Sequence, residues 1–90
     1  MYRELRKVLC RKWSLEILQF LAEEGTHNYS EIETELDTSS DIISDRLQHL
    51  SGVGLVIRDE RSHKDVRYSI SPEGKKLIQR LSELQSLLDE

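Results

Sequence analysis

The sequence has very little of what marks secreted and membrane-embedded chains. It contains a single cysteine, Cys10, which excludes an internal disulfide framework and is typical of a reducing cytoplasm. Its longest apolar runs are far shorter than the roughly 20 residues that a membrane-spanning helix needs. The charged segment 1–7 has no apolar stretch behind it, so no secretion signal is expected. These absences predict a cytoplasmic protein that does not enter a membrane.

Residue patterns for catalysis and cofactor binding are also missing. The four glycines form no phosphate-binding loop, and nothing orients serine, histidine and acid as a catalytic triad. Cys10, His27, His49 and His63 are scattered, without the pair spacing of a zinc site. We therefore expect no enzyme, no cofactor and no metal site, with the three histidines at the surface.

The length and the charge pattern describe one small domain with an uneven charge distribution. A chain of 90 residues allows one domain, which we place at 1–90. A chain this short buries only about 60% of its unfolded surface, so pairing through an apolar helix would stabilise it. The net charge of −4 argues mildly against nucleic-acid binding. However, segment 1–13 holds five basic residues and one acid, whereas segment 23–45 holds eight acids and no lysine or arginine.

The first quarter of the chain has the apolar spacing of a helix. Apolar residues recur at helical intervals from Leu5 to Leu21, and Gly25 is a natural helix terminator. Either one long helix or two fit this span, and Ser14 is a candidate cap for a second one. Trp13 falls on the apolar stripe and is interpreted as a core residue rather than as a stacking platform for bases.

Two further helices are predicted in close succession. Ser30 followed by Glu33 predicts a capping box for a short helix that ends near residue 37 and buries Ile32 and Leu36. A second helix, residues 39–50, follows after a polar corner. Two helices joined by so short a turn indicate a helix-turn-helix. Ile43, Leu47 and Leu50 of the second helix are expected to face inward, and Ser40, Asp41, Ser44, Asp45 and Gln48 outward.

A two-stranded hairpin follows the second helix. Gly52-Val53-Gly54 turns the chain into a first strand at 55–58, and a polar tip at 60–65 leads to a second strand at 66–70. Alternation of Val66, Tyr68 and Ile70 with polar residues is typical of a half-buried strand, which makes Tyr68 a core residue.

The last predicted helix begins at Pro72 and carries an apolar stripe. Leucines spaced four, three and four residues apart form the seam of a helix that packs on another helix. We expect a dimer through this helix, at about 71–90, joined by the N-terminal helix. The fold class is therefore mainly α with a small antiparallel β-hairpin, a winged helix-turn-helix that dimerises through its terminal helices. The predicted interface residues are Leu5, Leu9, Leu77, Leu81, Leu84 and Leu88.

Four motifs spread over roughly residues 9–78 carry a family resemblance. They are Lys12-Trp13, then Tyr29-Ser30-Glu31-Ile32, then Arg46-Leu47-Gln48-His49-Leu50 with Gly54-Leu55-Val56-Ile57-Arg58, and last Tyr68-Ser69-Ile70-Ser71 with Gly74 and Leu77. With these motifs the chain resembles the HxlR-type winged helix-turn-helix transcription regulators. The resemblance implies DNA-binding homodimers, commonly assembled from N- and C-terminal helices.

The chain departs from this family in three respects. Cys10-Arg11 stands where the family usually has two glycines. The redox-sensing cysteine of some members would lie upstream of residue 1, so Cys10 does not inherit that role. Its apolar neighbours predict a largely buried, unreactive thiol. The recognition helix also carries Asp41 and Asp45, with only Arg46 to offset them.

Candidate DNA contacts fall on the recognition helix and on the wing. Glutamine pairs with adenine and serine with several base edges, so Ser40, Ser44 and Gln48 are candidate base readers; the alternative is an ordinary solvated helix face. Basic wing residues are candidate phosphate contacts, although interleaved acids also fit a solvated hairpin. The basic residues of 1–13 either touch DNA or only carry solubilising charge. The candidate DNA-binding set is Ser39, Ser40, Ser44, Arg46, Gln48, Arg58, Arg61, His63, Lys64 and Arg67.

The predicted function is sequence-specific binding of double-stranded DNA by a homodimer that regulates transcription. Helix 39–50 would enter the major groove, and the hairpin would lie along the flanking backbone. The alternative is a winged-helix protein-interaction module that meets a basic partner through segment 23–45, with little or no DNA binding. An acidic DNA binder from a high-salt cytoplasm is a variant of the first hypothesis. Nothing in the sequence identifies a small-molecule effector.

Overall fold

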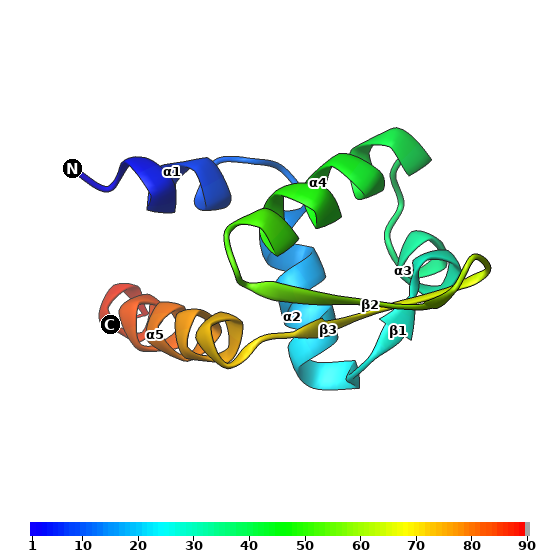
Figure 1. Cartoon of the computed structure of the whole chain (residues 1–90). Coiled ribbons are helices and arrows are strands. Elements are labelled where there is room, and N and C mark those ends of the chain that lie inside the picture. The colour runs from blue at the N-terminus through cyan, green and yellow to red at the C-terminus, as the bar shows by residue number, and fades with distance from the viewer. Residues whose placement is uncertain (90) are drawn as a thin grey trace.

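The computed structural model describes residues 1–89 and contains five helices and three strands (Figure 1). This architecture confirms the predicted fold class, mainly helical with a small antiparallel sheet. Within residues 1–89, no helix is both long enough and apolar enough to cross a membrane. In chain order the elements are α1 Arg3–Leu9, α2 Ser14–Glu24, β1 His27–Asn28, α3 Tyr29–Glu35, α4 Ser40–Gly52, β2 Val56–Ser62, β3 Asp65–Ile70 and α5 Pro72–Leu88.

The N-terminal span forms two helices, because the chain changes direction at Trp13. This residue has a left-handed backbone, with φ of 78°, which interrupts the helical hydrogen bonding. The predicted cap at Ser14 is wrong: Trp13 holds the N-cap position, and Ser14 is the first helical residue, fully buried. The expectation for Cys10 is also wrong. The residue ends α1 at an exposed corner, and its thiol is open to solvent.

The capping box of α3 forms two residues earlier than predicted. Asn28, not Ser30, is the N-cap, and its Oδ1 accepts a hydrogen bond from the Glu31 amide at 2.9 Å. In return the Asn28 amide donates to Glu31 Oε1, also at 2.9 Å. The helix ends at Glu35, short of the predicted end near residue 37, because Leu36 already has an extended backbone. The predicted buried residues Ile32 and Leu36 are confirmed.

The sheet has three strands in the order β1-β3-β2, one more than the predicted hairpin. The short strand β1 pairs His27 with Tyr68 and Asn28 with Arg67. The hairpin is also longer than expected, because β2 continues to Ser62 and the turn is reduced to His63 and Lys64.

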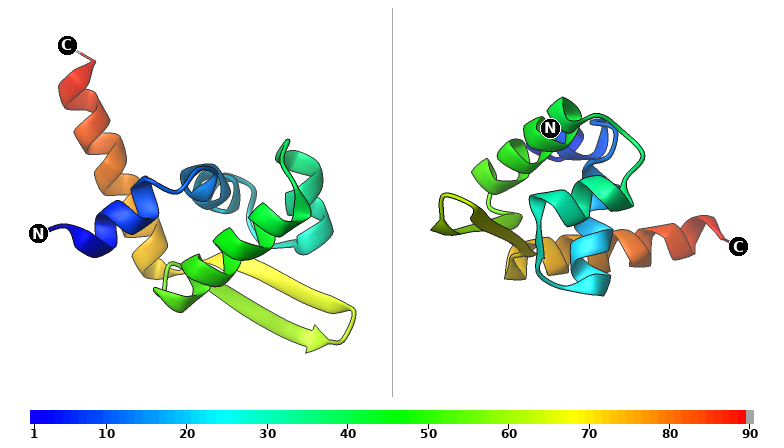
Figure 2. Two further views of the ribbon diagram at one scale, coloured as in Figure 1. Left: turned by 90° about the horizontal axis from the view of Figure 1, so that it is seen from above. Right: turned by 90° about the vertical axis from the view of Figure 1, so that its right-hand side faces the viewer.

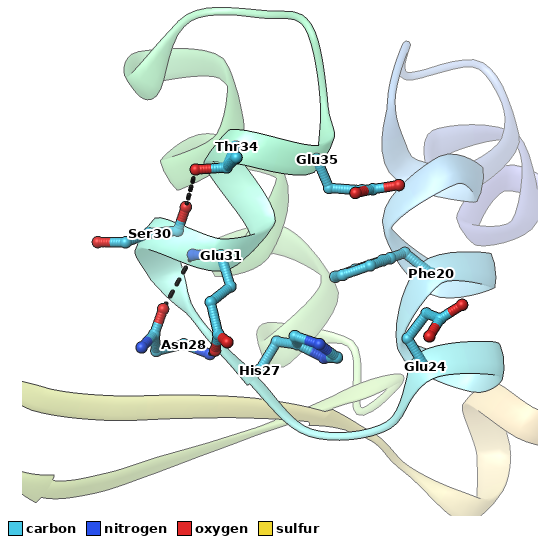
Figure 3. A pocket seen from close by; sticks show the side chains of 8 residues that line it. All are labelled: Phe20, Glu24, His27, Asn28, Ser30, Glu31, Thr34 and Glu35. Atoms are coloured by element: carbon cyan, nitrogen blue, oxygen red, sulfur yellow. Dashed lines mark hydrogen bonds between the residues drawn. The ribbon is translucent and has the colours of Figure 1, made fainter.

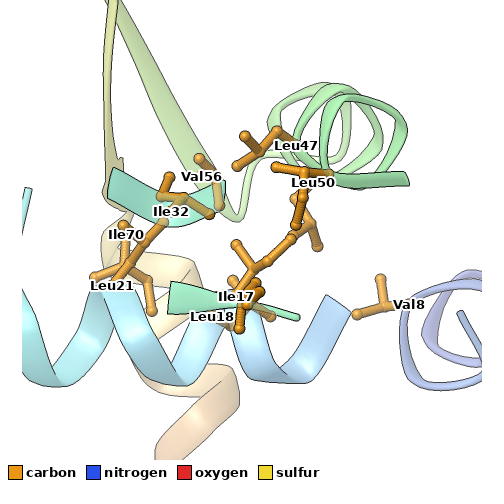
Figure 4. Close-up of a cluster of buried hydrophobic side chains, with 11 residues drawn as sticks. Val8, Ile17, Leu18, Leu21, Ile32, Leu47, Leu50, Val56 and Ile70 are labelled. Atoms are coloured by element: carbon orange, nitrogen blue, oxygen red, sulfur yellow. The ribbon is translucent and has the colours of Figure 1, made fainter. Parts of the chain in front are cut away.

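The core lies where α2, α3 and α4 meet the base of the hairpin (Figure 4). The three residues predicted to face inward from α4 are all at most 1% exposed, which confirms that prediction. Trp13 and Tyr68 pack against this core, as expected. The buried apolar residues are Val8, Ile17, Leu18, Leu21, Ile32, Leu36, Ile43, Leu47, Leu50, Val56 and Ile70.

The last helix leaves the sheet at a tightly packed corner. Ser71 caps α5 by accepting from the Gly74 amide at 3.0 Å, while its hydroxyl donates to the Gly54 carbonyl at 2.7 Å. A Cβ at position 74 would overlap the carbonyl oxygen of Leu55 and the side chain of Ile70, so only glycine fits there. From this corner α5 runs outward, and its C-terminal half projects beyond the rest of the molecule (Figure 2).

Candidate nucleic-acid interface

The outer face of α4 has two kinds of serine. Ser39 and Ser40 serve the turn before the helix: Ser39 Oγ accepts from the Ile42 amide at 3.4 Å, and the Ser40 hydroxyl donates to the carboxylate of Glu33. The Ser40 carbonyl also accepts from the Tyr29 hydroxyl at 2.6 Å. One turn further on, Ser44 is exposed on the helix surface, as is Gln48. Ser44 and Gln48 are thus the polar side chains of this face best placed to meet a ligand.

The arginine of α4 holds the helix against the linker before α2. Arg46 Nε donates to the carbonyl oxygen of Lys12 at 2.7 Å, and the guanidinium also pairs with Asp45. Asp45 receives a second cation from the linker, since Arg11 lies 3.7 Å away. This arrangement neutralises one of the two acids of the recognition helix. It also gives Arg46 a structural contact that its sequence position did not reveal.

A partly buried histidine lies beside this linker contact. The Nδ1 atom of His49 on α4 is shielded from solvent and has no hydrogen-bond partner within residues 1–89. Burial lowers the pKa of His49 below 6.5, and the charges of Arg11 and Lys7 lower it further, against the opposing effects of Asp45 and Glu4. His49 is therefore not the surface histidine that the sequence predicted.

Each wing arginine is paired with an acid two residues away. The N–O distance is 3.0 Å for Arg58–Glu60, for Arg61–Asp59 and for Arg67–Asp65. Residues two apart on a strand share one face, which explains the spacing. The hydrogen bond to Asp65 raises the pKa of Arg67, and the neighbouring side chains of Tyr68 and Glu60 raise the pKa of Arg58, so both arginines remain charged. Such exposed pairs contribute about 0–1 kcal/mol each, and a phosphate can displace the acid.

The tip of the wing holds the remaining basic candidates. His63 and Lys64 form the turn and are exposed, and the Lys64 amide donates to Ser62 Oγ at 3.3 Å. Between the base of the wing and α4 lies a hollow of about 410 Å³, which brings together Ser44, Gln48 and Arg58. The structure therefore gathers candidates from two segments of the sequence, whereas Arg46 is directed to the linker.

The acidic segment forms a separate hollow between α2 and α3, with a volume of about 580 Å³ (Figure 3). The rings of Phe20 and His27 lie 4.6 Å apart along it, and three glutamates surround them. His27 Nδ1 is hydrogen bonded to the Gly25 carbonyl at 2.9 Å. Glu24, Glu31 and Glu35 line this hollow. It is the surface that a protein-interaction module would offer to a basic partner.

Five of the six predicted interface leucines line two apolar grooves beside α5. Leu77 shares a groove of about 240 Å³ with Leu5 and Val8 of α1. A second groove, of about 500 Å³, lies between α5 and α2 and includes Leu81, Leu84 and Leu88. Leu84, Leu87 and Leu88 are 55%, 70% and 79% exposed, which is unusual for leucines on one stripe. Leu9, the last residue of α1, is half-buried.

The matching family and the similar solved structures agree on one class of protein. The family described as HxlR-like helix-turn-helix matches residues 8–90. A MarR-family protein from Enterococcus faecalis V583 has a similar structure, with a TM-score of 0.83 and 29% identity over 93% of this chain and 78% of its own. The reduced transcriptional regulator YodB from B. subtilis has a TM-score of 0.78 and 26% identity over 92% and 83%. HlyU from Vibrio cholerae N16961 has a TM-score of 0.74 and 28% identity over 90% and 87%. Among proteins of curated function, none matches this chain in sequence.

Proposed function

This chain belongs to the HxlR-like helix-turn-helix family of DNA-binding transcription regulators, and from that membership we propose that it is a cytoplasmic homodimer that binds double-stranded DNA at specific sequences. The observation that carries the proposal is the position of Ser44 and Gln48. Both are exposed on α4, and both line the hollow that the wing closes on its other side. A helix beside a hairpin is the arrangement that places one element in the major groove and the other at the flanking backbone.

The proposed contacts divide by role. Ser44 and Gln48 read base edges in the major groove, where glutamine recognises adenine. Arg58, Arg61, His63, Lys64 and Arg67 meet phosphates, which position the protein without reading sequence. Ser39, Ser40 and Arg46 act indirectly, since their side chains hold the turn and the linker that orient α4.

Dimerisation is proposed through α5 with help from α1. The exposed leucines of α5 continue the two apolar grooves, and a second copy of the same helix would cover them around a two-fold axis. The proposed interface residues are Leu5, Leu9, Leu77, Leu81, Leu84 and Leu88. Two recognition helices in such a dimer meet half-sites about one helical turn, roughly 34 Å, apart, so the operator is expected to be pseudo-palindromic.

Selection from a random-sequence duplex library, followed by anisotropy titration, tests this proposal. Gln48→Ala should cost about 1–3 kcal/mol on the selected site and relax its sequence preference, because one bidentate base contact is lost. Arg61→Ala and Lys64→Ala should weaken binding to every sequence and flatten its salt dependence. Lys76→Ala, an exposed charge on α5, serves as the control and should behave as wild type.

The competing hypothesis, a protein-interaction module, has a distinct outcome. If no duplex binds better than about micromolar at moderate salt, or at the internal salt of the source cell, and the wing variants change nothing, the regulator proposal fails. Charge reversal of Glu24 and Glu35, which line the acidic hollow, would then be expected to abolish capture of a basic protein partner. For a DNA binder, the same reversal leaves DNA affinity unchanged or tighter.

A further inference from the structure

The hollow between α4 and the wing is lined almost entirely by hydrogen-bond donors. Five of its six lining residues carry a donor side chain, none is acidic, and Leu47 is the exception. Three come from α4 and two from opposite positions in the wing, where Arg58 of β2 pairs with Tyr68 of β3. The donors are Ser44, Gln48, Ser51, Arg58 and Tyr68.

Arg58 differs from the other wing arginines in its position. It lies nearer to the base of the hairpin than Arg61 and Arg67, directly across from Tyr68. The side chains of Arg58 and Tyr68 line the hollow together, and the Tyr68 hydroxyl can donate a hydrogen bond to a ligand there. Arg58 donates a hydrogen bond to Glu60 at 3.0 Å, and both members of this pair are about half exposed. Arg58 therefore lines the hollow with an exposed partner, Glu60, that a ligand can replace.

Duplex geometry supplies the ligand for this hollow. With α4 in the major groove and the wing against the flanking backbone, the phosphodiester strand at the groove's edge runs between the two elements. Resting on the proposed DNA-binding function, we infer that this hollow is a binding site for a single backbone phosphate. Arg58 and the Tyr68 hydroxyl bind it from the wing, while Ser44 and Gln48 form the opposite wall. Arg58 releases Glu60 when it binds the phosphate. This contact then sets how deeply α4 enters the major groove, where Gln48 reads the bases.

Single neutral linkages in the DNA test this inference. Methylphosphonate is placed at one linkage at a time across a half-site of the selected duplex, and affinity is measured for wild type and for Arg58→Gln. One linkage should weaken wild type by roughly ten- to hundredfold, about as much as Arg58→Gln does on unmodified DNA. The same linkage should have no further effect on Arg58→Gln. The salt slope of Arg58→Gln should also fall by about 0.9 for each half-site.

Three further variants separate a bound phosphate from a general effect of charge. Arg80→Gln on α5 removes another exposed, acid-paired arginine, outside the wing, and should show the wild-type pattern of linkages. Arg58→Lys keeps the charge but lacks the planar fork, and should fall between wild type and Arg58→Gln. Tyr68→Phe keeps the ring against the core, so it should weaken DNA binding in wild type but not in Arg58→Gln.

The outcomes are distinguishable. If Arg58→Gln and every neutral linkage act independently, so that their effects multiply, Arg58 acts only through long-range charge and the phosphate site is refuted. If Tyr68→Phe is equally harmful with and without Arg58, the two side chains do not share one phosphate, which also refutes the site. If Arg58→Gln melts well below wild type, the test uses Arg58→Lys instead. A neutral linkage that weakens Arg58→Lys less than it weakens wild type supports the site, and an equal effect on both refutes it. A wild-type chain that binds no duplex refutes both this site and the proposed function.

Discussion

At the level of individual residues, the surface of the recognition helix repels phosphate less than its sequence indicates. Asp45 is neutralised by Arg46 and by Arg11 from the linker. Asp41 lies in the first turn of α4, where the helix dipole favours a negative charge. The face that remains for DNA is a neutral hydrogen-bonding strip of Ser44 and Gln48. The surface of α4 therefore repels phosphate much less than a surface with two unpaired carboxylates would.

His49 should make stability depend on pH. Its pKa is lowered in the folded state, mainly by burial, so above about pH 6.5 the side chain is neutral in both states and has no effect. As the pH falls below 6.5, the unfolded chain binds the proton first and the free energy of unfolding decreases, until the folded-state pKa is passed. His49→Gln should therefore lose less stability than wild type between pH 7 and pH 5.

Urea unfolding at fixed protein concentration measures this difference. His63→Gln, at the exposed wing tip, is the matched control and should keep the pH dependence of wild type. Equal pH dependence in wild type and His49→Gln would show that the buried Nδ1 has no influence on folding.

Among the helices and strands, β1 and the wing decide how the helix-turn-helix is attached to the rest of the chain. Strand β1 ends at Asn28, whose side chain begins α3, so one residue joins the sheet to the first helix of the motif. The wing is anchored at its base by Gly74, which allows α5 to approach Leu55. Its outer part has mostly exposed side chains and local ion pairs, the features of a segment that adapts to a ligand.

Asn28→Ala should cost about 1 kcal/mol of stability, because it removes the side-chain acceptor of the α3 capping box. Ser30→Ala, two residues further on, should change stability by only a few tenths of a kcal/mol, since its exposed side chain does not cap the helix. Urea unfolding of both variants distinguishes them. A larger loss of stability for Ser30→Ala than for Asn28→Ala would contradict the cap at Asn28 and support the capping box predicted at Ser30.

In the molecule as a whole, charge and apolar surface are separated. The acidic hollow lies between α2 and α3, and the wing carries exposed arginines. The C-terminal half of α5, with its exposed leucines, extends beyond the body (Figure 2). A net charge of −4 is thus compatible with a locally basic DNA-facing wing. The elongated shape, 46 × 25 × 25 Å, reflects the outward course of α5, the helix proposed to form the dimer (Figure 2).

Leu84→Glu should convert the proposed dimer into a folded monomer. Leu84 is more than half exposed in the single chain, so a charge there is solvated in the monomer but would be buried in the dimer. Gln79→Glu adds the same charge on the opposite face of α5 and should remain dimeric. Sedimentation at micromolar concentration measures both. A wild-type chain that sediments as a monomer under these conditions would contradict the assembly.

Local patterns in the sequence were sufficient to predict several elements. Three residues of α4 repeat at helical spacing and are buried, and alternation in 66–70 correctly predicted a half-buried strand. Ser71-Pro72 marked the start of α5 correctly. Periodicity is sufficient in these cases because each element buries one face, and the positions on that face are set by the geometry of a helix or a strand.

Contacts between distant segments set the features that no local pattern predicted. Strand β1 has two polar residues and no pattern of its own; it exists because β3 offers it an edge. The N-cap of α3 is Asn28 rather than the predicted Ser30, because β1 ends at Asn28. Arg46 meets a carbonyl 34 residues away, and Cys10 is exposed because the chain turns sharply before Trp13. Likewise the hollow that joins Gln48 to Arg58 arises when the hairpin folds back beside α4, since a site built from two segments depends on their packing rather than on either pattern alone.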